Sequence, residues 1–285
     1  MKKAFEPVIK WPGSKRRIAP RLSKLLAGGK CYYEPFVGGG AMLPVRDCVQ
    51  AVAGDIIPEL IALWEAIRDY PQTTADEYEL RWKRLQRQGH QAYYTIRDTF
   101  NTTRDPHDFL FLTRTCVNGL VRFNANQEFN NSLHHTRPGI APARLRSVIQ
   151  QWSSVLQDVT FLAADYRKTL ATVTAEDTVF LDPPYAGTKG RYMPGDFEFT
   201  HLYEEMARLN ALGARWVLTL DGRAGSRTYH ALVPAGLYRA RVGLATGDSP
   251  FSKVMHNKAE TVIESVYLNF EPPAELEAQA APSHR

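Results

Sequence analysis

The sequence predicts an α/β fold: a doubly wound, mostly parallel sheet with an inserted, mainly helical module. Three observations predict it. Short apolar strands alternate with amphipathic helices toward both ends of the chain, a run of glycines follows the first strand, and the middle of the chain shows helical patterns without a convincing buried strand. With 285 residues, 44% of them hydrophobic, the chain can bury a sizeable core.

The first part of the chain follows a strand–helix–strand–helix order. Residues 31–37 predict a strand, and residues 41–48, after the glycines, predict a short helix. Residues 51–55 predict a second strand that ends in an acid. In residues 57–67 apolar side chains recur at helical spacing, so this segment predicts a helix. This order, with a glycine-rich first turn, is typical of the start of a doubly wound sheet.

The middle of the chain has a different composition, rich in Arg, Asn, Gln and Tyr. Helices are predicted over residues 75–88, 91–102 and 106–116, and a loop that could contain a hairpin over residues 118–142. We therefore predict that residues 71–146 form a module inserted into the α/β domain.

The alternation resumes after this module. Helices are predicted over 143–156 and 200–212, and strands over 159–163, 178–181, 216–220 and 261–270. The continuous apolar run of 178–181 is typical of a central parallel strand. We predict that residues 1–70 and 147–270 form one discontinuous domain, and that residues 271–285, rich in Pro, Ala and Glu, form a disordered tail.

Basic charge is concentrated in two stretches. Residues 1–30 contain nine Lys and Arg and one acid, and residues 81–146 contain eleven Lys and Arg and four acids. Since the net charge of the chain is +5, the remainder carries −10. This distribution is typical of a protein that binds a polyanion, although two solvated basic faces would give the same pattern.

Several classes of protein are disfavoured. No apolar run reaches the about 18 residues that a membrane span needs, and no apolar signal segment follows the basic start. Cys31, Cys48 and Cys116 are odd in number and widely spaced, which disfavours a disulfide framework and a zinc site. His134 and His135 have no third ligand at a suitable spacing, so we expect no metal.

A nucleoside-containing cofactor is indicated by the first two strand ends. Gly38, Gly39 and Gly40 lack a Cβ and let the backbone approach a ligand closely. Asp55 ends the next strand, where an acid accepts hydrogen bonds from a ribose diol in folds of this kind. The absence of a GxGxxG fingerprint disfavours a dinucleotide. S-Adenosyl-L-methionine, which has a ribose but no phosphate, suits such a turn; a tight turn without a ligand is the plain alternative.

The strongest local signal follows the apolar strand 178–181, and consists of Asp182, Pro183, Pro184 and Tyr185. The lone pair of the adenine N6 nitrogen is delocalised into the ring, so that nitrogen is a poor nucleophile. The Asp182 carboxylate and the Pro183 carbonyl would localise this lone pair by accepting hydrogen bonds, and two prolines would hold both acceptors rigid. Tyr185 offers a stacking face for a base, which would have to be flipped out of a duplex at a cost of about a few kcal/mol. The alternative is a Pro-Pro turn with a capping Asp.

Taken in order, the motifs of this chain resemble those of the Dam-like family of DNA adenine-N6 methyltransferases, in the alpha order. The resemblance covers about residues 7–270 and rests on the segments 10–15, 34–40, 55, 118–124 with 129–130, 165–166 and 182–185. It implies the fold of a class I S-adenosylmethionine-dependent methyltransferase. The discontinuous domain would be catalytic, and the inserted module would recognise the target.

The resemblance also implies roles for individual residues. The cofactor site would be lined by Trp11, Lys15, Phe36, Gly38, Asp55, Asp165 and Asp182. Asp55 would bind the ribose, and Lys15 would lie near the methionine carboxylate. By residue type alone, Trp11 would belong to the core, Lys15 to the surface, and Asp165 would be the N-cap of a helix over residues 166–170.

The loop after Val117 contains side chains suited to reading base edges, because Arg pairs with guanine and Asn or Gln pairs with adenine. In the similar family this loop contacts the target sequence, and the lysine before the tryptophan reaches a base. The predicted DNA-binding residues are Lys10, Asn118, Leu120, Arg122, Asn124, Asn126 and Arg137. Arg137, together with Arg114, Arg144 and Arg146, is expected to lie on phosphates, which position the protein without specifying a sequence.

Two positions depart from the family pattern. Val117 stands where the family has an aromatic wedge, and residues 134–139 replace a basic segment. Both departures argue against assuming a GATC recognition site, and neither affects the chemistry.

We therefore predict a site-specific DNA adenine-N6 methyltransferase that uses S-adenosyl-L-methionine and double-stranded DNA. We expect no metal and no membrane association, and a monomer in the cytoplasm of a bacterial or phage-infected cell. Two alternatives stay open: an RNA or protein amide methyltransferase of the same fold, and a non-catalytic DNA-binding relative. Protein-glutamine methylation usually pairs with Asn rather than Asp before Pro-Pro-Tyr, and a pure binder has no need of Asp182, Tyr185 or Asp55.

Overall fold

The centre of the fold is a mostly parallel sheet, which confirms the predicted α/β class. The computed structural model describes residues 4–134, 136, 139–184, 197–224, 227–228, 233–248 and 261–273. Its strands are β1 (Cys31–Glu34), β2 (Gln50–Asp55), β3 (Val159–Ala163), β4 (Thr178–Leu181), β5 (Arg215–Ala224), β6 (Arg227–Thr228), β7 (Ala240–Asp248) and β8 (Thr261–Leu268).

The strands lie in the order β3-β2-β1-β4-β5-β8-β7, and β6 pairs with β5 outside this path. The first five are parallel, whereas β8 is antiparallel to both of its neighbours. Because the carboxyl ends of parallel strands meet at one edge of a sheet, the residues that follow β1, β2, β3 and β4 converge there.

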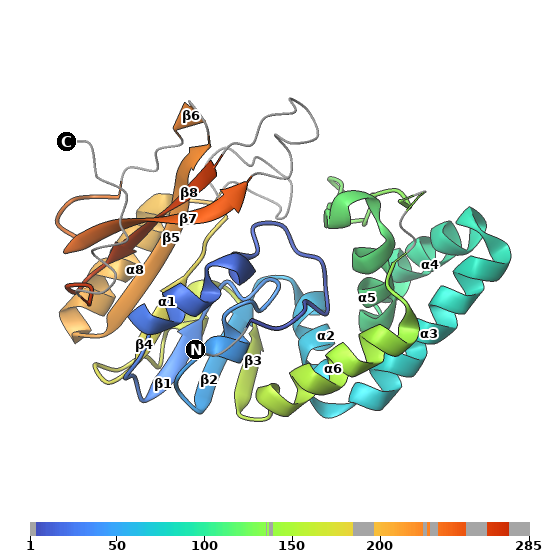
Figure 1. Ribbon diagram of the computed structural model, residues 1–285, viewed down its shortest axis with the longest axis horizontal. Coiled ribbons are helices and arrows are strands. Elements are labelled where there is room, and N and C mark those ends of the chain that lie inside the picture. Colours follow the sequence, from blue (N-terminus) through green and yellow to red (C-terminus); the bar gives the residue numbers. More distant parts are fainter. Residues whose placement is uncertain are drawn as a thin grey trace.

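Helices cover this sheet and extend beyond one of its edges (Figure 1). Prolines in the first turn begin several of them, where the missing N–H costs no hydrogen bond. The helices are α1 (Ala19–Leu25), α2 (Pro58–Asp69), α3 (Pro71–Gln88), α4 (His90–Thr103), α5 (Pro106–Thr115), α6 (Pro142–Leu156), α7 (Tyr166–Thr169) and α8 (Phe199–Leu212), with 3₁₀ turns at Lys15–Arg17, Leu43–Val45 and Val117–Gly119.

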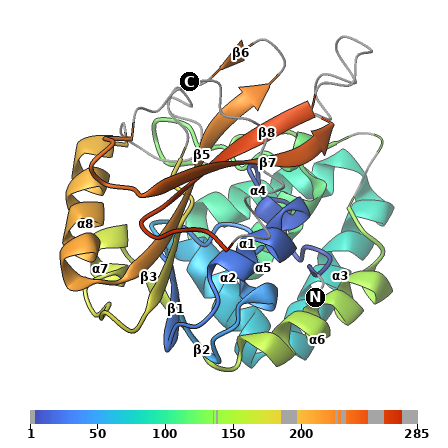
Figure 2. The same cartoon turned by 60° about the vertical axis from the view of Figure 1, so that its left-hand side comes forward.

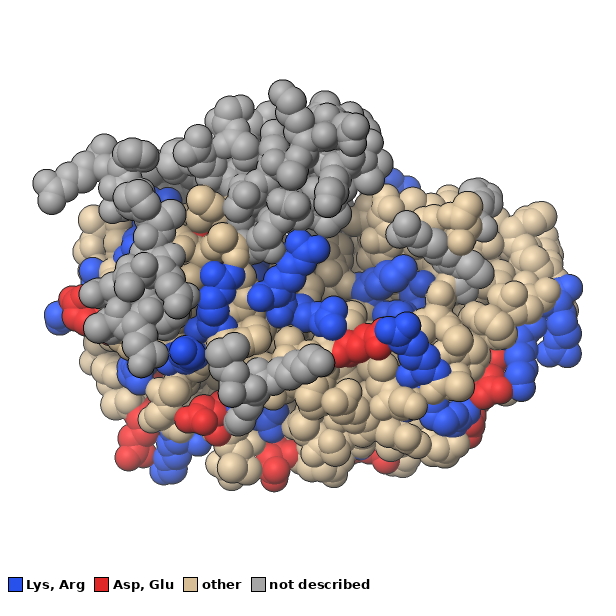
Figure 3. Space-filling view, in the orientation of Figure 1, with Lys and Arg blue, Asp and Glu red and all other residues tan. Residues whose placement is uncertain are grey.

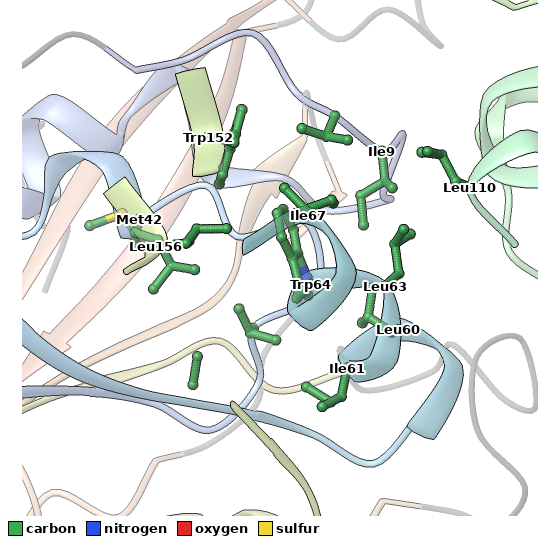
Figure 4. Close-up of a cluster of buried hydrophobic side chains, with 14 of the residues drawn as sticks. Ile9, Met42, Leu60, Ile61, Leu63, Trp64, Ile67, Leu110, Trp152 and Leu156 are labelled. Carbon is green, nitrogen blue, oxygen red and sulfur yellow. The ribbon is translucent and has the colours of Figure 1, made fainter. Parts of the chain in front are cut away.

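Helices α3, α4 and α5 gather at one end of the molecule, beyond the edge strand β3, whereas β7 and β8 lie toward the other end (Figure 1). Figure 2 shows α7 and α8 on one side of the sheet and α2, α3 and α6 on the other. Helix α5 is buried from Asp108 to Thr115, and its apolar side chains belong to the same hydrophobic cluster as those of α2 and α6. Figure 4 shows Leu110 of α5 beside Ile9 and Leu63. The sheet and the helical segment therefore share one core.

The predicted helix over residues 41–48 is wrong. The structure has a single 3₁₀ turn there, Leu43–Val45, which contains Pro44 and ends at Arg46 in an extended conformation. A proline cannot donate the backbone hydrogen bond that would continue an α-helix.

Three elements, α1, β6 and β7, were not predicted. Helix α1 follows a cluster of basic residues, and β7 contains two glycines and forms the end of the sheet. Neither shows the continuous apolar run of a central strand or a long helical repeat, because each buries only part of its surface. The predicted division between residues 146 and 147 lies inside α6, which is continuous from Pro142 to Leu156.

Candidate active site

A cavity of about 230 Å³ opens where the parallel strands end. It is lined by residues from the N-terminal segment and from the ends of β1, β2, β3 and β4. The structure thus brings together all seven residues expected at a cofactor site, along with the two prolines after β4: Trp11, Lys15, Phe36, Gly38, Asp55, Asp165, Asp182, Pro183 and Pro184.

The glycine turn after β1 is held between two tryptophans. A Cβ on Gly38 would lie 2.6 Å from Nε1 of Trp11, and a Cβ on Gly39 would lie 2.9 Å from the Trp11 Cβ. From the other side, the indole N–H of Trp64 donates a hydrogen bond to the Gly38 carbonyl at 3.0 Å. Gly38 also has a φ of +44°, so this turn requires glycine for both conformation and space.

Asp55, at the end of β2, is bound to this turn. Its Oδ2 accepts a hydrogen bond from the Gly38 N–H at 3.1 Å, and its Oδ1 accepts one from the Ile57 N–H at 3.2 Å. Burial raises the pKa of Asp55 to about 6, although these backbone hydrogen bonds act to lower it. The group is therefore mainly a carboxylate at neutral pH and can accept hydrogen bonds from hydroxyl groups.

Asp182, directly after β4, takes part in a buried charged cluster. The Lys15 ammonium lies 2.8 Å from Asp182 Oδ1 and 3.2 Å from Oε1 of Glu264, and it donates to the Gly13 carbonyl at 3.1 Å. The hydroxyl of Thr219 donates to the same Asp182 Oδ1 at 2.8 Å. Only 4% of the Lys15 side chain is exposed, so its place is in the cavity wall rather than on the surface.

Sequence reasoning missed Glu264 and Thr219. Both are buried side chains in segments that consist mostly of apolar residues. A buried polar or charged side chain costs free energy unless it is paired. An acid and a hydroxyl within mostly apolar segments were therefore the available signal.

An aromatic wall forms another side of the cavity. The ring of Phe36 lies 5.3 Å from that of Tyr166 and 5.8 Å from that of Phe197, between centroids. All three line the cavity, although only Phe36 was expected there. Such a surface suits a planar heteroaromatic ring.

Asp165 serves as an N-cap and also lines the cavity. Its Oδ1 accepts a hydrogen bond from the Arg167 N–H at 3.0 Å at the start of α7. Burial acts to raise the pKa of Asp165, but the Arg167 side chain and backbone outweigh it and lower that pKa.

Glu34 is a further buried acid in the cavity wall. It accepts a hydrogen bond from the Tyr32 hydroxyl at 3.0 Å, and burial raises its pKa well above the usual range. Two of the predicted site residues, Tyr185 and Arg137, lie outside the described residues.

The segment after α5 forms a hairpin that packs on α4. Antiparallel bridges join Cys116 to Leu133 and Phe123 to Phe129. The Asn101 side chain of α4 accepts a hydrogen bond from the Phe129 N–H at 2.7 Å and donates to its carbonyl at 3.2 Å. The hairpin that residues 118–142 could contain is therefore present and is anchored on the helices.

The predicted DNA-reading side chains differ in their surroundings on this hairpin. Arg122 is exposed, and its Nε donates to Oδ1 of Asn130 at 2.8 Å. By contrast, Asn124 Oδ1 accepts hydrogen bonds from the Asn126 and Glu128 N–H groups at 3.0 and 2.9 Å, which stabilises the turn. Further exposed residues on the same segment are Asn118, Leu120 and Asn126.

Lys10 and the hairpin are brought together although they are far apart in sequence. Gly119 has a φ of +64°, and a Cβ there would lie 2.5 Å from the Lys10 Cβ. The Lys10 stem thus packs against the turn that contains Asn118.

The expectation that Arg114 lies on a phosphate is wrong. Arg114 is only 6% exposed and donates to the Pro7 carbonyl at 3.1 Å, so it ties the N-terminal segment to α5. Arg146 pairs with Asp76 at 2.7 Å and Glu79 at 2.8 Å. Arg144 is mainly exposed and pairs with Glu6 at 3.0 Å.

Lys and Arg side chains nevertheless gather in the middle of the face shown in Figure 3, between the part of the molecule that contains the sheet and the helical end. Among the described residues, no group of three or more His, Cys, Asp or Glu could hold a metal ion. No helix within the described ranges is long and apolar enough to cross a membrane.

Comparisons with known proteins agree on one family. The family described as D12 class N6 adenine-specific DNA methyltransferase matches residues 11–211. A DNA adenine methylase of Salmonella typhi is 31% identical over 262 residues, 86% of this chain and 91% of that protein. The retron Ec67 DNA adenine methylase of Escherichia coli is 31% identical over 67% of each chain, and a DNA adenine methylase of Serratia marcescens is 30% identical over 62% of this chain and 66% of its own length.

Proposed function

This chain belongs to the D12 class of N6 adenine-specific DNA methyltransferases, and we propose that it transfers a methyl group from S-adenosyl-L-methionine to the N6 nitrogen of an adenine in a short double-stranded DNA site. One observation carries the proposal. The Asp182–Pro183–Pro184 segment opens into the same cavity as the glycine turn and Asp55, so a nucleoside-binding region and an amino-binding region are adjacent.

The lining of the cavity fits S-adenosyl-L-methionine chemically. Asp55 offers a carboxylate to the ribose diol, Phe36 offers an aromatic face to the adenine ring, and Gly38 allows close approach of the backbone. Trp11 and Asp165 would complete the site, and Lys15 would contribute positive charge. When bound, the cofactor supplies an electrophilic methyl group.

The residues after β4 would act on the target base. The Asp182 carboxylate and the Pro183 carbonyl would accept hydrogen bonds from the two amino hydrogens and so concentrate the nitrogen lone pair toward the methyl group. Pro183 and Pro184 restrict the backbone, which holds both acceptors in place before the base arrives. The flipped base would stack on Tyr185.

Double-stranded DNA is the proposed partner. Arg122, Asn118, Leu120 and Asn126 are exposed on the anchored hairpin, and Lys10 lies against its first turn. These residues would contact base edges, while Asn124 would mainly shape the turn. Arg137 would contribute from the neighbouring segment. We propose further that the protein acts as a monomer in the cytoplasm of a bacterial or phage-infected cell.

Methyl transfer can be measured directly. The protein is incubated with tritiated S-adenosyl-L-methionine and with double-stranded DNA, tRNA or a protein mixture, and the labelled unit is identified after digestion. We expect label in DNA, as N6-methyladenine. Asp182→Ala should lower the rate by at least about 100-fold while DNA affinity is retained, because an acceptor used in the transition state is lost.

Asp158→Ala is the matched control, since Asp158 is an exposed acid before β3, at the opposite ends of the strands, and it should behave as the wild type. Label found only in RNA or protein would contradict the proposal. Retained DNA binding without any methyl transfer would indicate a non-catalytic relative.

A further inference from the structure

We infer that Thr219 and Glu264 are positioning residues for the catalytic carboxylate: together with Lys15 they fix Asp182 by its Oδ1 atom, so that Oδ2 accepts the hydrogen bond from the adenine amino group. This inference rests on the proposed function and assigns a role to two side chains outside residues 11–211, the range that the family description matches.

The register of the sheet places Thr219 next to Asp182. Leu181 of β4 pairs with Leu218 of β5, so the residues that follow on these two parallel strands are Asp182 and Thr219. The Thr219 hydroxyl, which is fully buried, donates to Asp182 Oδ1 at 2.8 Å. The Lys15 ammonium reaches this same oxygen, also at 2.8 Å.

Glu264 acts on Asp182 through Lys15. It projects from β8, is 7% exposed, and its Oε1 lies 3.2 Å from the Lys15 ammonium. A buried ion pair is weak evidence for stability, because desolvation of both charges offsets their attraction. The geometry explains this ion pair better. The Lys15 ammonium has carboxylates on two sides and the Gly13 carbonyl as a third acceptor, so its position is defined.

Two donors on one oxygen restrict the rotation of a carboxylate. The second oxygen is then presented in a fixed direction, next to the Pro183 carbonyl on a proline-restricted backbone. Such preorganisation lowers the barrier of the chemical step without contributing to the affinity for cofactor or DNA. Loss of Thr219 or Glu264 should therefore slow methyl transfer and leave binding unchanged.

Thr219→Val tests this, because valine keeps the shape of threonine and removes only the hydroxyl. We expect its single-turnover rate of DNA methylation to fall by about tenfold, the effect of losing one hydrogen bond to a charged group. The dissociation constants for S-adenosyl-L-methionine and DNA should stay within twofold, about the precision of such measurements. Thr219→Ser, which restores the hydroxyl, should recover most of the rate.

Glu264→Gln provides a second, independent variant. It keeps the size of the side chain and removes the negative charge beside Lys15, and we expect a severalfold lower single-turnover rate with unchanged binding. Glu176→Gln is its matched control, since the Glu176 side chain is 70% exposed and pairs with Lys30, away from the cavity. Glu264→Gln alone decides the question if Thr219→Val does not fold.

The inference is overturned if Thr219→Val methylates DNA at the wild-type rate, if Thr219→Ser is as slow as Thr219→Val, or if the loss appears in cofactor affinity instead of rate. These results require an active wild-type protein and leave the proposed function intact. A wild-type protein that transfers no methyl group to DNA overturns the proposed function itself.

Discussion

Asp55 illustrates how the environment of one residue sets its chemistry. Its carboxylate is bound by backbone N–H groups on both sides, which favour the charged form, yet burial dominates and raises its pKa to about 6. An aspartate in water has a pKa near 3.8. The acid therefore changes charge close to physiological pH, where an ordinary aspartate would not.

We predict that the affinity for S-adenosyl-L-methionine falls as the pH drops through about 6. Above this pH Asp55 is ionised and can accept hydrogen bonds from both ribose hydroxyls, whereas its protonated form is a poorer acceptor. Titration calorimetry between pH 5 and pH 8 measures the change. Asp55→Asn, which cannot ionise, should bind weakly and without this pH dependence; an equal pH dependence in both proteins would contradict the assignment.

The contribution of Asp55 to the free energy of unfolding changes with pH in the opposite direction to that of a salt-bridged acid. Because the pKa of Asp55 is raised in the folded state, the folded protein binds this proton more tightly than the unfolded chain does. The contribution of Asp55 to the free energy of unfolding is thus most favourable below about pH 4 and is lost as the pH rises through 6.

At the scale of elements, the turn after β1 depends on contacts that its own sequence does not show. Three consecutive glycines predict a tight turn, but Trp11 explains why no side chain fits at Gly38 or Gly39, and Trp64 lies 3.0 Å from a Cβ built at Gly40. The tryptophans come from the N-terminal segment and from α2, so the turn is shaped by two elements that are distant in sequence.

We predict that Gly38→Ala weakens S-adenosyl-L-methionine binding by at least about tenfold and lowers the free energy of unfolding by about 1–3 kcal/mol, the range for an overpacked site. The added Cβ would collide with Trp11 at a residue whose φ is positive. Gly236→Ala is the control, because no atom lies within 4 Å of a Cβ there. Calorimetry and urea unfolding measure both quantities, and wild-type binding by Gly38→Ala would refute this view of the turn.

In the hairpin after α5, some polar side chains stabilise the turn, whereas others are exposed. Asn124 was expected to read DNA, but its side chain accepts two backbone hydrogen bonds and donates to Glu128 at 2.8 Å. Arg122 is exposed with its Nε bound by Asn130, which orients the guanidinium. The Asn and Arg residues in the sequence indicate a polar segment, but only the fold shows which of these side chains remain available to contact DNA.

At the scale of the whole molecule, the helical segment is joined to the sheet by a shared core. Leu110 of α5, Leu63 of α2 and Ile9 of the N-terminal segment are each almost completely buried in one cluster (Figure 4). Buried Arg114 adds a hydrogen bond between α5 and the N-terminal segment. The two parts are therefore expected to unfold together.

We predict that Leu110→Ala lowers the free energy of unfolding of the entire chain by about 2–5 kcal/mol, the usual range for a buried leucine. Urea unfolding followed by tryptophan fluorescence and by circular dichroism should give a single, coincident transition for wild type and variant. Leu80→Ala is the control, since Leu80 is 59% exposed and should cost about 0.5 kcal/mol or less. Two separate transitions would show that the parts are independent domains.

The sequence by itself determined the fold class and the family. Its strands and helices are local patterns of apolar residues, and its motifs, such as the run at 182–184, have a fixed composition and order, so both can be recognised without coordinates. It failed at residues 41–48, and it did not predict β7, because a proline or an edge position weakens the local pattern.

Only the tertiary structure decided which side chains meet. Thr219 and Glu264 come from β5 and β8, and their role depends on a strand register and on Lys15, none of which is encoded locally. Likewise Arg114 looks like any other arginine of the basic segment until the packing of α5 buries it. The physical reason is the same in each case: burial, pairing and pKa are set by neighbours that the chain brings together only when it folds.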